Sequence, residues 1–369
     1  MSSAVTLTGV AAGSLSAPTD VELFTEGDAL YAAMLASIRG ARRGVSMESY
    51  LFAGDEIGWE FARALAERAK AGVEVRLHLD AAGALGGSSL SLVRFLRERG
   101  ARVKWFHRWS WRRPLRYNRR NHRKLLVIDD RLAYIGGFNI HRESSRRCYG
   151  DARWRDTHAA ISGALVLDTA TLFDAFWRGH RHWMPAQGGS ASLVSNHTRN
   201  CRHRIRCLYS EAFAGARERI YLSTPYFVPD LLMQQRLMAA ARRGIDVRLL
   251  VPSRSDVPIT RWAARAFYAA LIAAGVRVYE YLPRMLHAKT VAIDGRWAAL
   301  GTANFDYRSF FLNYELVVAV GEARVCALLE RQFLHDLTQS LPVTAGSWAR
   351  RRWPQRLLEG VGWTMRRWL

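Results

Sequence analysis

Two copies of one short motif contain the residues of this 369-residue sequence that are best suited to chemistry. Each copy has a histidine, a lysine two residues further on and an aspartate five residues after the lysine, and a glycine and an asparagine follow at a shared offset. Because residues two apart on a β-strand share a face, each histidine and its lysine are expected to project together. We therefore predict that both copies fold into one active site. The members are His122, Lys124, Asp129, Gly136 and Asn139, and then His287, Lys289, Asp294, Gly301 and Asn304.

This combination of side chains suits the cleavage of a phosphodiester bond. Two ammonium groups and two amides can hold the phosphoryl oxygens and the charge that grows on them in the transition state. One imidazole can attack phosphorus while the other protonates the leaving oxygen, since the neutral and charged forms of histidine are both accessible near neutral pH. This chemistry requires no metal and no other cofactor. Cys201, His203 and Cys207 lie close in the sequence, but no second ligand pair at zinc-like spacing accompanies them.

Each histidine also needs an acceptor that orients its second ring nitrogen. Asp156 and Glu315 are the candidates, because each is expected on the strand that follows its motif, and Glu143 is a weaker candidate. Gly137 and Thr302 occupy equivalent places in the two halves and are expected in substrate binding beside the two asparagines.

The second half of the chain repeats the first, and this repeat predicts the elements that position the motifs. Residues 41–52 match 216–227, and the Gly-led segments 72–79 and 244–251 are also alike. Short β-rich runs alternate with helical stretches, which predicts an α/β fold with a mostly parallel or mixed sheet flanked by helices in each of two similar, pseudo-two-fold lobes. The expected divisions are a flexible N-terminus (1–18), a first lobe (19–186), a linker (187–199), a second lobe (200–345) and a basic amphipathic tail (346–369).

Composition restricts the class of protein and its partners. Hydrophobic residues make up 49% of the chain, which excludes a disordered protein, and the formal net charge of +22 favours a polyanionic partner such as nucleic acid or an anionic membrane surface. The sequence has neither a signal-peptide pattern nor an uncharged apolar run of membrane-spanning length, so contact with a membrane is expected to be peripheral. The four cysteines form no CxxC pair, which suits a reducing compartment.

The two motifs closely resemble those of the phospholipase D superfamily, whose signature HxK(x)4D(x)6GxxN occurs twice in a chain. The resemblance extends over almost the whole sequence and includes segments 48–50, 154–158, 224–230 and 301–309. Within the superfamily the chain is most similar to the bacterial cardiolipin synthases, and among these to the B type, which does not begin with two membrane-spanning helices. Gly137 stands where many members have serine, a difference that we expect to be harmless because Thr302 fills the equivalent place in the second half.

The resemblance implies a two-step phosphatidyl transfer between phospholipids, with phosphatidylglycerol as donor, acceptor or both. It implies that His122 forms a phospho-histidine intermediate and that His287 is the acid and base. Lys124, Lys289, Asn139 and Asn304 would hold the phosphate, and Asp129 and Asp294, which we count with the catalytic residues, would support the site. The implied location is the cytoplasmic side of a bacterial cell membrane. Two motifs in one chain make a monomeric site sufficient and leave a dimer open.

Other functions stay open at this point. The superfamily also contains phospholipase D-type hydrolases and nucleases, and basic and aromatic side chains could follow single-stranded nucleic acid. A protein that binds lipid or DNA without catalysis is a third alternative. Two segments favour a membrane: the insertion at residues 105–121, and a C-terminal stretch with apolar residues at i+4 spacing among arginines. The apolar residues of that stretch are Trp353, Leu357, Val361 and Met365.

Overall fold

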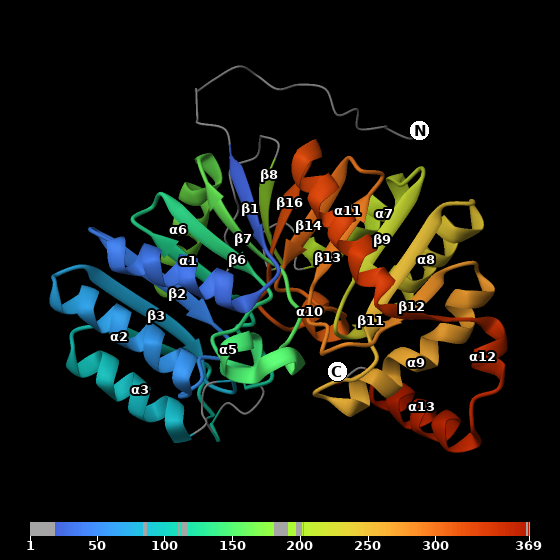
Figure 1. Cartoon of the computed structure of the whole chain (residues 1–369), viewed down its shortest axis with the longest axis horizontal. Helices are drawn as coiled ribbons and strands as arrows, with labels where there is room; N and C mark the ends of the chain where they lie inside the picture. The colour runs from blue at the N-terminus through green and yellow to red at the C-terminus, as the bar shows by residue number, and fades with distance from the viewer. Residues whose placement is uncertain are drawn as a thin grey trace.

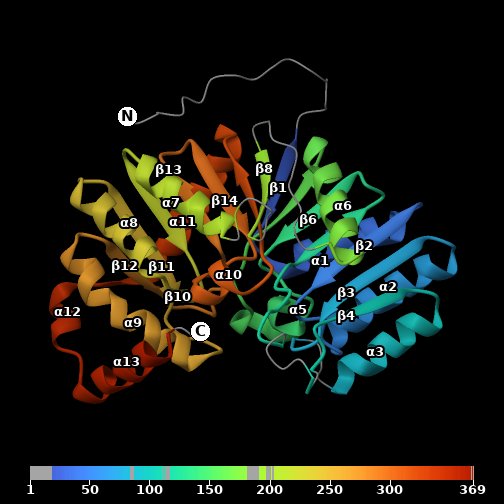
Figure 2. The same ribbon diagram turned by 180° about the vertical axis from the view of Figure 1, so that it is seen from behind.

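A computed structural model of the chain shows two α/β lobes side by side (Figures 1 and 2). It describes residues 19–83, 87–109, 111–112, 117–180, 191–196, 201, 203–366 and 368. The expected flexible N-terminus (1–18) and most of the expected linker (187–199) lie outside the described residues.

The first lobe is built on a seven-stranded mixed sheet with the order β1-β7-β6-β5-β2-β3-β4. The strands β2, β3 and β4 run parallel, and the remaining neighbours pair antiparallel. The strands are β1 (Asp20–Phe24), β2 (Gly44–Ser49), β3 (Glu74–Asp80), β4 (Arg102–Phe106), β5 (Leu125–Ile128), β6 (Leu132–Gly136) and β7 (His158–Ser162).

Helices cover both faces of this sheet because its strands are apolar on both sides. On β5, Leu126 and Ile128 join the core under α1, α2 and α3, whereas Leu125 and Val127 face the core that contains α6. The helices are α1 (Gly27–Gly40), α2 (Glu56–Lys70), α3 (Gly87–Glu98), α5 (Arg146–Tyr149) and α6 (Ala164–Trp177), with 3-10 turns η1 (Arg142–Ser144) and η2 (Gly150–Ala152).

The second lobe repeats this plan with one additional edge strand. Its eight-stranded sheet has the order β17-β12-β11-β9-β13-β14-β16-β8, so β9, β11 and β12 take the places of β2, β3 and β4. The strands are β8 (Ala191–Ser195), β9 (Arg219–Ser223), β11 (Asp246–Pro252), β12 (Arg277–Tyr281), β13 (Thr290–Ile293), β14 (Trp297–Gly301), β16 (Leu316–Val320) and β17 (Ser340–Val343).

Helices again lie on both faces of the second sheet, and a short parallel pair joins β10 to β15. The remaining elements are α7 (Arg204–Gly215), α8 (Leu231–Arg242), β10 (Phe227–Val228), α9 (Pro258–Ala273), β15 (Phe305–Asp306), α10 (Tyr307–Phe311), α11 (Ala323–Thr338), α12 (Ala345–Ala349) and α13 (Trp353–Met365). The α/β class and the paired lobes predicted from the repeat are confirmed.

Two of the expected divisions, the linker and the tail, contain regular elements. Strand β8 lies inside the expected linker, where it pairs with β16, so the second sheet begins before residue 200. The sequence around β8 is rich in small residues, which is typical of a linker, so the buried position of Leu193 was not expected.

The expected amphipathic tail forms α12 and α13. Helix α13 packs beside α9, and Gly362 permits this approach, because a Cβ there would lie 2.4 Å from the backbone nitrogen of Ala263.

The two sheets meet across the pseudo-two-fold axis. Apolar residues of β5, β6 and β7 share one buried cluster with residues of β14 and β16, and α6 and α11 also contribute to it. A buried ion pair links the lobes, with Arg155 Nη2 2.8 Å from Asp336 Oδ2. This joint core fixes the lobes relative to each other, as a composite active site requires.

Candidate active site

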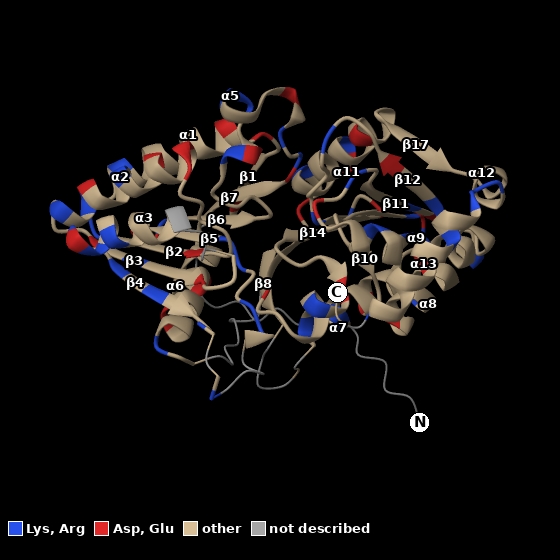
Figure 3. Cartoon of the chain, turned by 90° about the horizontal axis from the view of Figure 1, so that it is seen from below, with Lys and Arg blue, Asp and Glu red and all other residues tan. Residues whose placement is uncertain are grey.

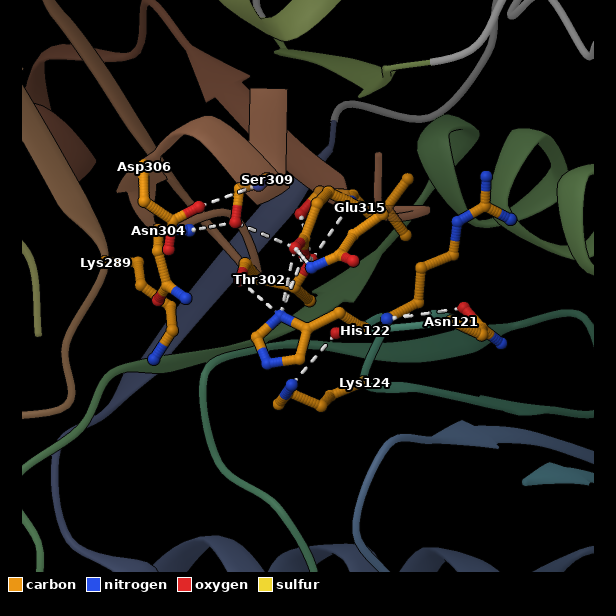
Figure 4. A network of polar contacts seen from close by, with 12 residues as sticks. Asn121, His122, Lys124, Lys289, Thr302, Asn304, Asp306, Ser309 and Glu315 are labelled. Carbon is orange, nitrogen blue, oxygen red and sulfur yellow. Dashed lines mark hydrogen bonds and ion pairs between the residues drawn. The ribbon is translucent and has the colours of Figure 1, made fainter. Parts of the chain in front are cut away.

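Both histidines line one cavity of about 520 Å³ between the lobes, a volume within the range of small-molecule sites. Each His-x-Lys segment lies just before its strand, β5 or β13, where the chain enters the sheet from the cleft. Asn139 and Asn304 also line the cavity, so the predicted convergence of the two motifs is found. Figure 4 shows Lys289 of the second motif close to His122 and Lys124 of the first.

The orienting carboxylates come from the opposite lobes. His122 Nδ1 lies 3.0 Å from Glu315 Oε1, and His287 Nδ1 lies 2.5 Å from Asp156 Oδ2. Both carboxylates are buried. Because Nδ1 is engaged on each ring, Nε2 is the nitrogen left for the substrate. Both carboxylates were expected from the sequence, as residues on the strand following each motif, but each precedes its strand and serves the histidine of the other lobe.

Backbone hydrogen bonds also link each motif to the opposite lobe. The amide of His122 donates to the carbonyl of Tyr314 at 2.9 Å, and the amide of His287 donates to the carbonyl of Arg155. Each acceptor is the residue directly before the orienting carboxylate. The backbone of each motif and its carboxylate are therefore positioned as one unit across the lobe interface.

The two carboxylates have different surroundings despite this symmetry. Glu315 accepts hydrogen bonds from the hydroxyls of Thr302 and Ser309 as well as pairing with His122 (Figure 4). In the first half Gly137 replaces Thr302, and a Cβ there would lie 2.0 Å from Asp156 Oδ1. The glycine is thus more than a harmless replacement, because Asp156 occupies the space that a side chain would need.

The two lysines lie within the buried site. Lys124 Nζ donates to the carbonyl of His122 at 2.9 Å, and Lys289 Nζ lies 2.9 Å from His287 Nδ1 and 3.7 Å from Asp156 Oδ2. Burial lowers the pKa of Lys124 to about 7 and also lowers the pKa of Lys289. A bound phosphodiester anion would favour the charged form of both lysines.

Burial also sets the protonation states of the histidines. It lowers the pKa of His122 and of His287, although Glu315 and Asp156 oppose this effect. Both imidazoles are therefore neutral near pH 7 before substrate binds, which suits a nucleophile. An anionic phosphodiester between them would raise the pKa of each ring and supply the protonated state that an acid needs.

Asp129 and Asp294 do not belong to the catalytic group in which they were placed. Each follows its strand at the end remote from the histidine, where its carboxylate accepts from backbone amides of the segment leading into β2 or β9. Asp129 accepts from Gly44 at 2.9 Å, and Asp294 from Arg219 at 2.8 Å. Their part of the motif stabilises the sheet that carries the histidines.

Four further side chains at the cleft were not identified individually. Tyr50 and Trp154 contact the imidazoles of His122 and His287, with ring centroids 4.9 Å and 5.0 Å apart. Tyr226 donates to Asp256 at 2.8 Å, and both line the cavity. Three of the four lie in segments 48–50, 154–158 and 224–230, so the resemblance to the phospholipase D superfamily could have identified them. No sequence pattern pointed to Asp256.

Within the described part of the chain, no cluster of three or more His, Cys, Asp or Glu side chains could hold a metal ion. Cys201 and Cys207 approach each other, with their sulfur atoms 3.5 Å apart, while the ring of His203 packs against Phe311.

A two-lobed α/β fold in which a histidine from each half lines one cavity, with a buried lysine close to each histidine, defines a class of two-motif phosphodiester enzymes. Residues 34–163 and 209–337 both match the family described as cardiolipin synthase, PLD-like domain. A cardiolipin synthase of Clostridium perfringens is 32% identical over 360 residues, covering 93% of this chain and 75% of that protein. One of Staphylococcus aureus is 31% identical, covering 94% and 73%. This chain belongs to the cardiolipin synthase family with phospholipase D-like domains.

Solved structures support the same fold. The phosphatidylserine synthase of Haemophilus influenzae superimposes with a TM-score of 0.74 over 95% of each chain at 13% identity. The polyphosphate kinase of Porphyromonas gingivalis gives a TM-score of 0.62 over 93% of this chain and 53% of that one, at 14% identity.

Proposed function

We propose that this protein is a phosphatidyltransferase of the cardiolipin synthase type, which converts two molecules of phosphatidylglycerol into cardiolipin and glycerol. The observation that carries this proposal is the single cavity lined by both imidazoles, each paired with a carboxylate of the other lobe. Membership of the cardiolipin synthase family supports the choice of phospholipids as substrates.

The first step forms a phospho-histidine. Nε2 of His122 attacks the phosphorus of one phosphatidylglycerol, a P–N bond forms and the P–O bond to the head-group glycerol breaks. His287 gives its Nε2 proton to the departing glycerol oxygen. Glu315 holds the Nδ1 proton of His122 and so directs its Nε2 lone pair to the substrate, as in other carboxylate–histidine pairs.

The second step transfers the phosphatidyl group. The terminal hydroxyl of a second phosphatidylglycerol attacks phosphorus and gives its proton to Nε2 of His287. The P–N bond breaks, and its electron pair returns to the imidazole of His122. Lys124 and Lys289 stabilise the charge on the phosphoryl oxygens in both steps, since a buried ammonium interacts with them far more strongly than one in water.

Product identification tests this proposal. The purified protein is incubated with phosphatidylglycerol vesicles and, separately, with labelled single-stranded and double-stranded DNA. We expect cardiolipin and glycerol in equal amounts and intact DNA. Phosphatidic acid as the main lipid product would establish a hydrolase instead, and cleaved DNA with unchanged lipid would establish a nuclease.

The crowding at Gly137 gives a first prediction. We expect Gly137→Ala to lower the rate of cardiolipin formation about 10- to 100-fold, because the new methyl group displaces Asp156 from His287 and the loss of such orienting contacts has effects of this size. The matched control is Gly215→Ala, where a Cβ meets no atom within 4 Å. An unchanged rate in Gly137→Ala would show that Asp156 is not required at its present position.

We also infer that the protein binds the cytoplasmic face of a bacterial membrane peripherally through α13. None of the helices that the structure describes is long and apolar enough to cross a membrane. The predicted i+4 row of α13 points outward: Trp353 is 75% exposed and Leu357 is 62% exposed, while Val361 and Met365 are also exposed. Lys and Arg residues are distributed along the backbone of both lobes (Figure 3), so this apolar row, rather than net charge, distinguishes the docking face.

A paired substitution tests this inference. We expect Trp353→Ala with Leu357→Ala to weaken co-sedimentation with phosphatidylglycerol vesicles roughly tenfold, because two exposed apolar side chains no longer enter the lipid. Leu167→Ala on α6 removes an equally exposed leucine, also 62% exposed, and should leave binding unchanged. Equal binding by all three proteins would exclude α13 as the docking helix. Deleting the whole tail (346–369) is a poorer test, because it would also remove Trp348, which is buried against Tyr268 in the core of the second lobe.

A further inference from the structure

Arg308 is a cleft cation that the catalytic steps above do not use. It lies in α10 and lines the same cavity as the two histidines. Its guanidinium donates to Asn118 Oδ1 at 2.9 Å, to the carbonyl of Asn118 at 2.7 Å and to the carbonyl of Trp368 at 3.4 Å. All three acceptors are neutral, so these contacts orient the positive charge without cancelling it. The buried carboxylate of Asp306 in the same cavity also attracts this charge, although the two side chains form no ion pair among the described residues.

The other arginine that lines this cavity differs in both respects. Arg120 is buried, and its guanidinium forms an ion pair with the buried carboxylate of Asp80 at 3.3 Å. Its charge is therefore already compensated inside the protein. Arg308 is the better anion ligand of the two, because a guanidinium whose hydrogen bonds go to neutral acceptors retains more of its attraction for a phosphate than one in a direct ion pair.

Comparison of the two halves shows that Arg308 breaks the pseudo-symmetry. Arg308 follows Asn304 by four residues, and Glu143 follows Asn139 by the same number. Glu143 pairs with His141 at 2.7 Å and lines a neighbouring cavity. The corresponding positions thus carry opposite charges, and of the two residues Arg308 is the one that lines the cavity with the histidines.

Arg308 is also held firmly relative to the catalytic centre. Its neighbour Ser309 donates from its backbone to Asp306 at 2.7 Å and from its hydroxyl to Glu315 at 3.0 Å. Glu315 in turn orients His122. The residue next to Arg308 therefore belongs to the hydrogen-bond network of His122, the proposed nucleophile. Arg308 lies in the second lobe and His122 in the first.

We propose that Arg308 and Asn118 form a second phosphate subsite, which binds the phosphodiester of the acceptor lipid while its terminal hydroxyl attacks the phosphatidyl-histidine. This inference rests on the proposed function. The two phosphorus atoms of cardiolipin are joined by a single glycerol, so the acceptor phosphate must lie in the same cavity as the reacting one. The subsite selects an alcohol that carries its own phosphodiester over water or a neutral alcohol, and thereby favours transfer over hydrolysis.

The test compares two water-soluble acceptors with phosphatidylglycerol as donor. Glycerophosphoglycerol carries a phosphodiester, whereas labelled glycerol is neutral, and neither has acyl chains that would confuse membrane contact with phosphate binding. We expect Arg308→Gln to lower the ratio of transfer to glycerophosphoglycerol over transfer to glycerol about 10- to 100-fold, the effect of losing a charge-assisted pair of hydrogen bonds. Arg308→Lys, which keeps the charge but not the fork, should lower the ratio less.

Controls separate this inference from the proposed function. Arg296→Gln removes one positive charge from the exposed turn between β13 and β14 and should leave the acceptor ratio unchanged. Thermal unfolding of each variant identifies any loss of fold. If the unmodified protein transfers phosphatidyl groups but Arg308→Gln reduces both acceptors equally, the subsite is refuted while the function stands. If the unmodified protein forms no cardiolipin from phosphatidylglycerol vesicles, the proposed function itself fails.

Discussion

Replacing either active-site histidine should nearly abolish cardiolipin formation. We expect His122→Gln to lower the rate by about 10⁴-fold or more, because His122 forms the covalent intermediate in the proposed mechanism, and His287→Gln by about 10²- to 10⁴-fold, the usual contribution of a general acid and base. The measurement is the initial rate with phosphatidylglycerol vesicles. His335→Gln on the exposed face of α11 is the matched control and should retain full activity.

The double variant makes this prediction diagnostic of one shared site. Because both imidazoles act on one phosphorus atom, His122→Gln with His287→Gln should lose no more activity than the more severe single variant. If the lobes instead held two independent sites, each single variant would retain about half of the activity and only the double variant would be inactive. That pattern would contradict the arrangement in the cavity.

Removing the charge of an orienting carboxylate should have the next largest effect. We expect Glu315→Gln and Asp156→Asn each to lower the rate by about 10²- to 10⁴-fold, because an amide can hold the imidazole in the wrong tautomer and cannot stabilise its charged form. The direct pairing distances of 3.0 Å and 2.5 Å support so large an effect. Asp129→Asn is the comparison. The Asp129 carboxylate accepts from backbone amides where the chain enters β2, so this substitution should change stability more than turnover.

Nuclear magnetic resonance of histidines labelled with nitrogen-15 can establish which carboxylate serves which ring. The Nδ1–H signal that disappears in His122→Gln should move in Glu315→Gln and stay in place in Asp156→Asn. The signal that disappears in His287→Gln should behave in the opposite way. Pairing within each lobe would give the reverse result and would refute the crossed arrangement.

The sequence predicted the fold and the chemical groups because both depend on local patterns. The repeat of apolar and helical segments is visible without any contact. His122 and Lys124 lie together as expected, although both precede β5 and do not lie on a strand. The equal offsets of Asn139 and Asn304 predicted their place in the cavity for the same reason. Which face a periodic segment buries follows from its local pattern, whereas its ends were less well predicted, as Asp156 and Glu315 show by preceding their strands.

The crossed pairing could not be predicted in this way, because it spans the lobes. His122 and Glu315 are separated by 193 residues, and His287 and Asp156 by 131. The sequence names the four groups but does not say how two similar sheets dock. The contacts of Asp129 and Asp294 were also not predicted. Each follows its lysine by five residues, but the strand between them places the carboxylate far from the cleft.

The sequence around Arg308 contains a pattern from which no prediction was made. Its offset from Asn304 equals that of Glu143 from Asn139, so aligning the two repeats reveals a reversal of charge. Only the structure adds that Arg308 lines the catalytic cavity and contacts Asn118 of the other lobe. Strand β8 illustrates the opposite case, since its five small and apolar residues resemble a linker until β16 pairs with them.

The most direct test of the account is a crystal structure of the protein with orthovanadate, an analogue of the transferring phosphoryl group. We predict one vanadium atom per chain, bonded to Nε2 of His122, with Nε2 of His287 and the ammonium groups of Lys124 and Lys289 within hydrogen-bond distance of its oxygens. Vanadate bound by one motif alone, with the histidine of the other lobe out of contact, would contradict a single site built by both lobes.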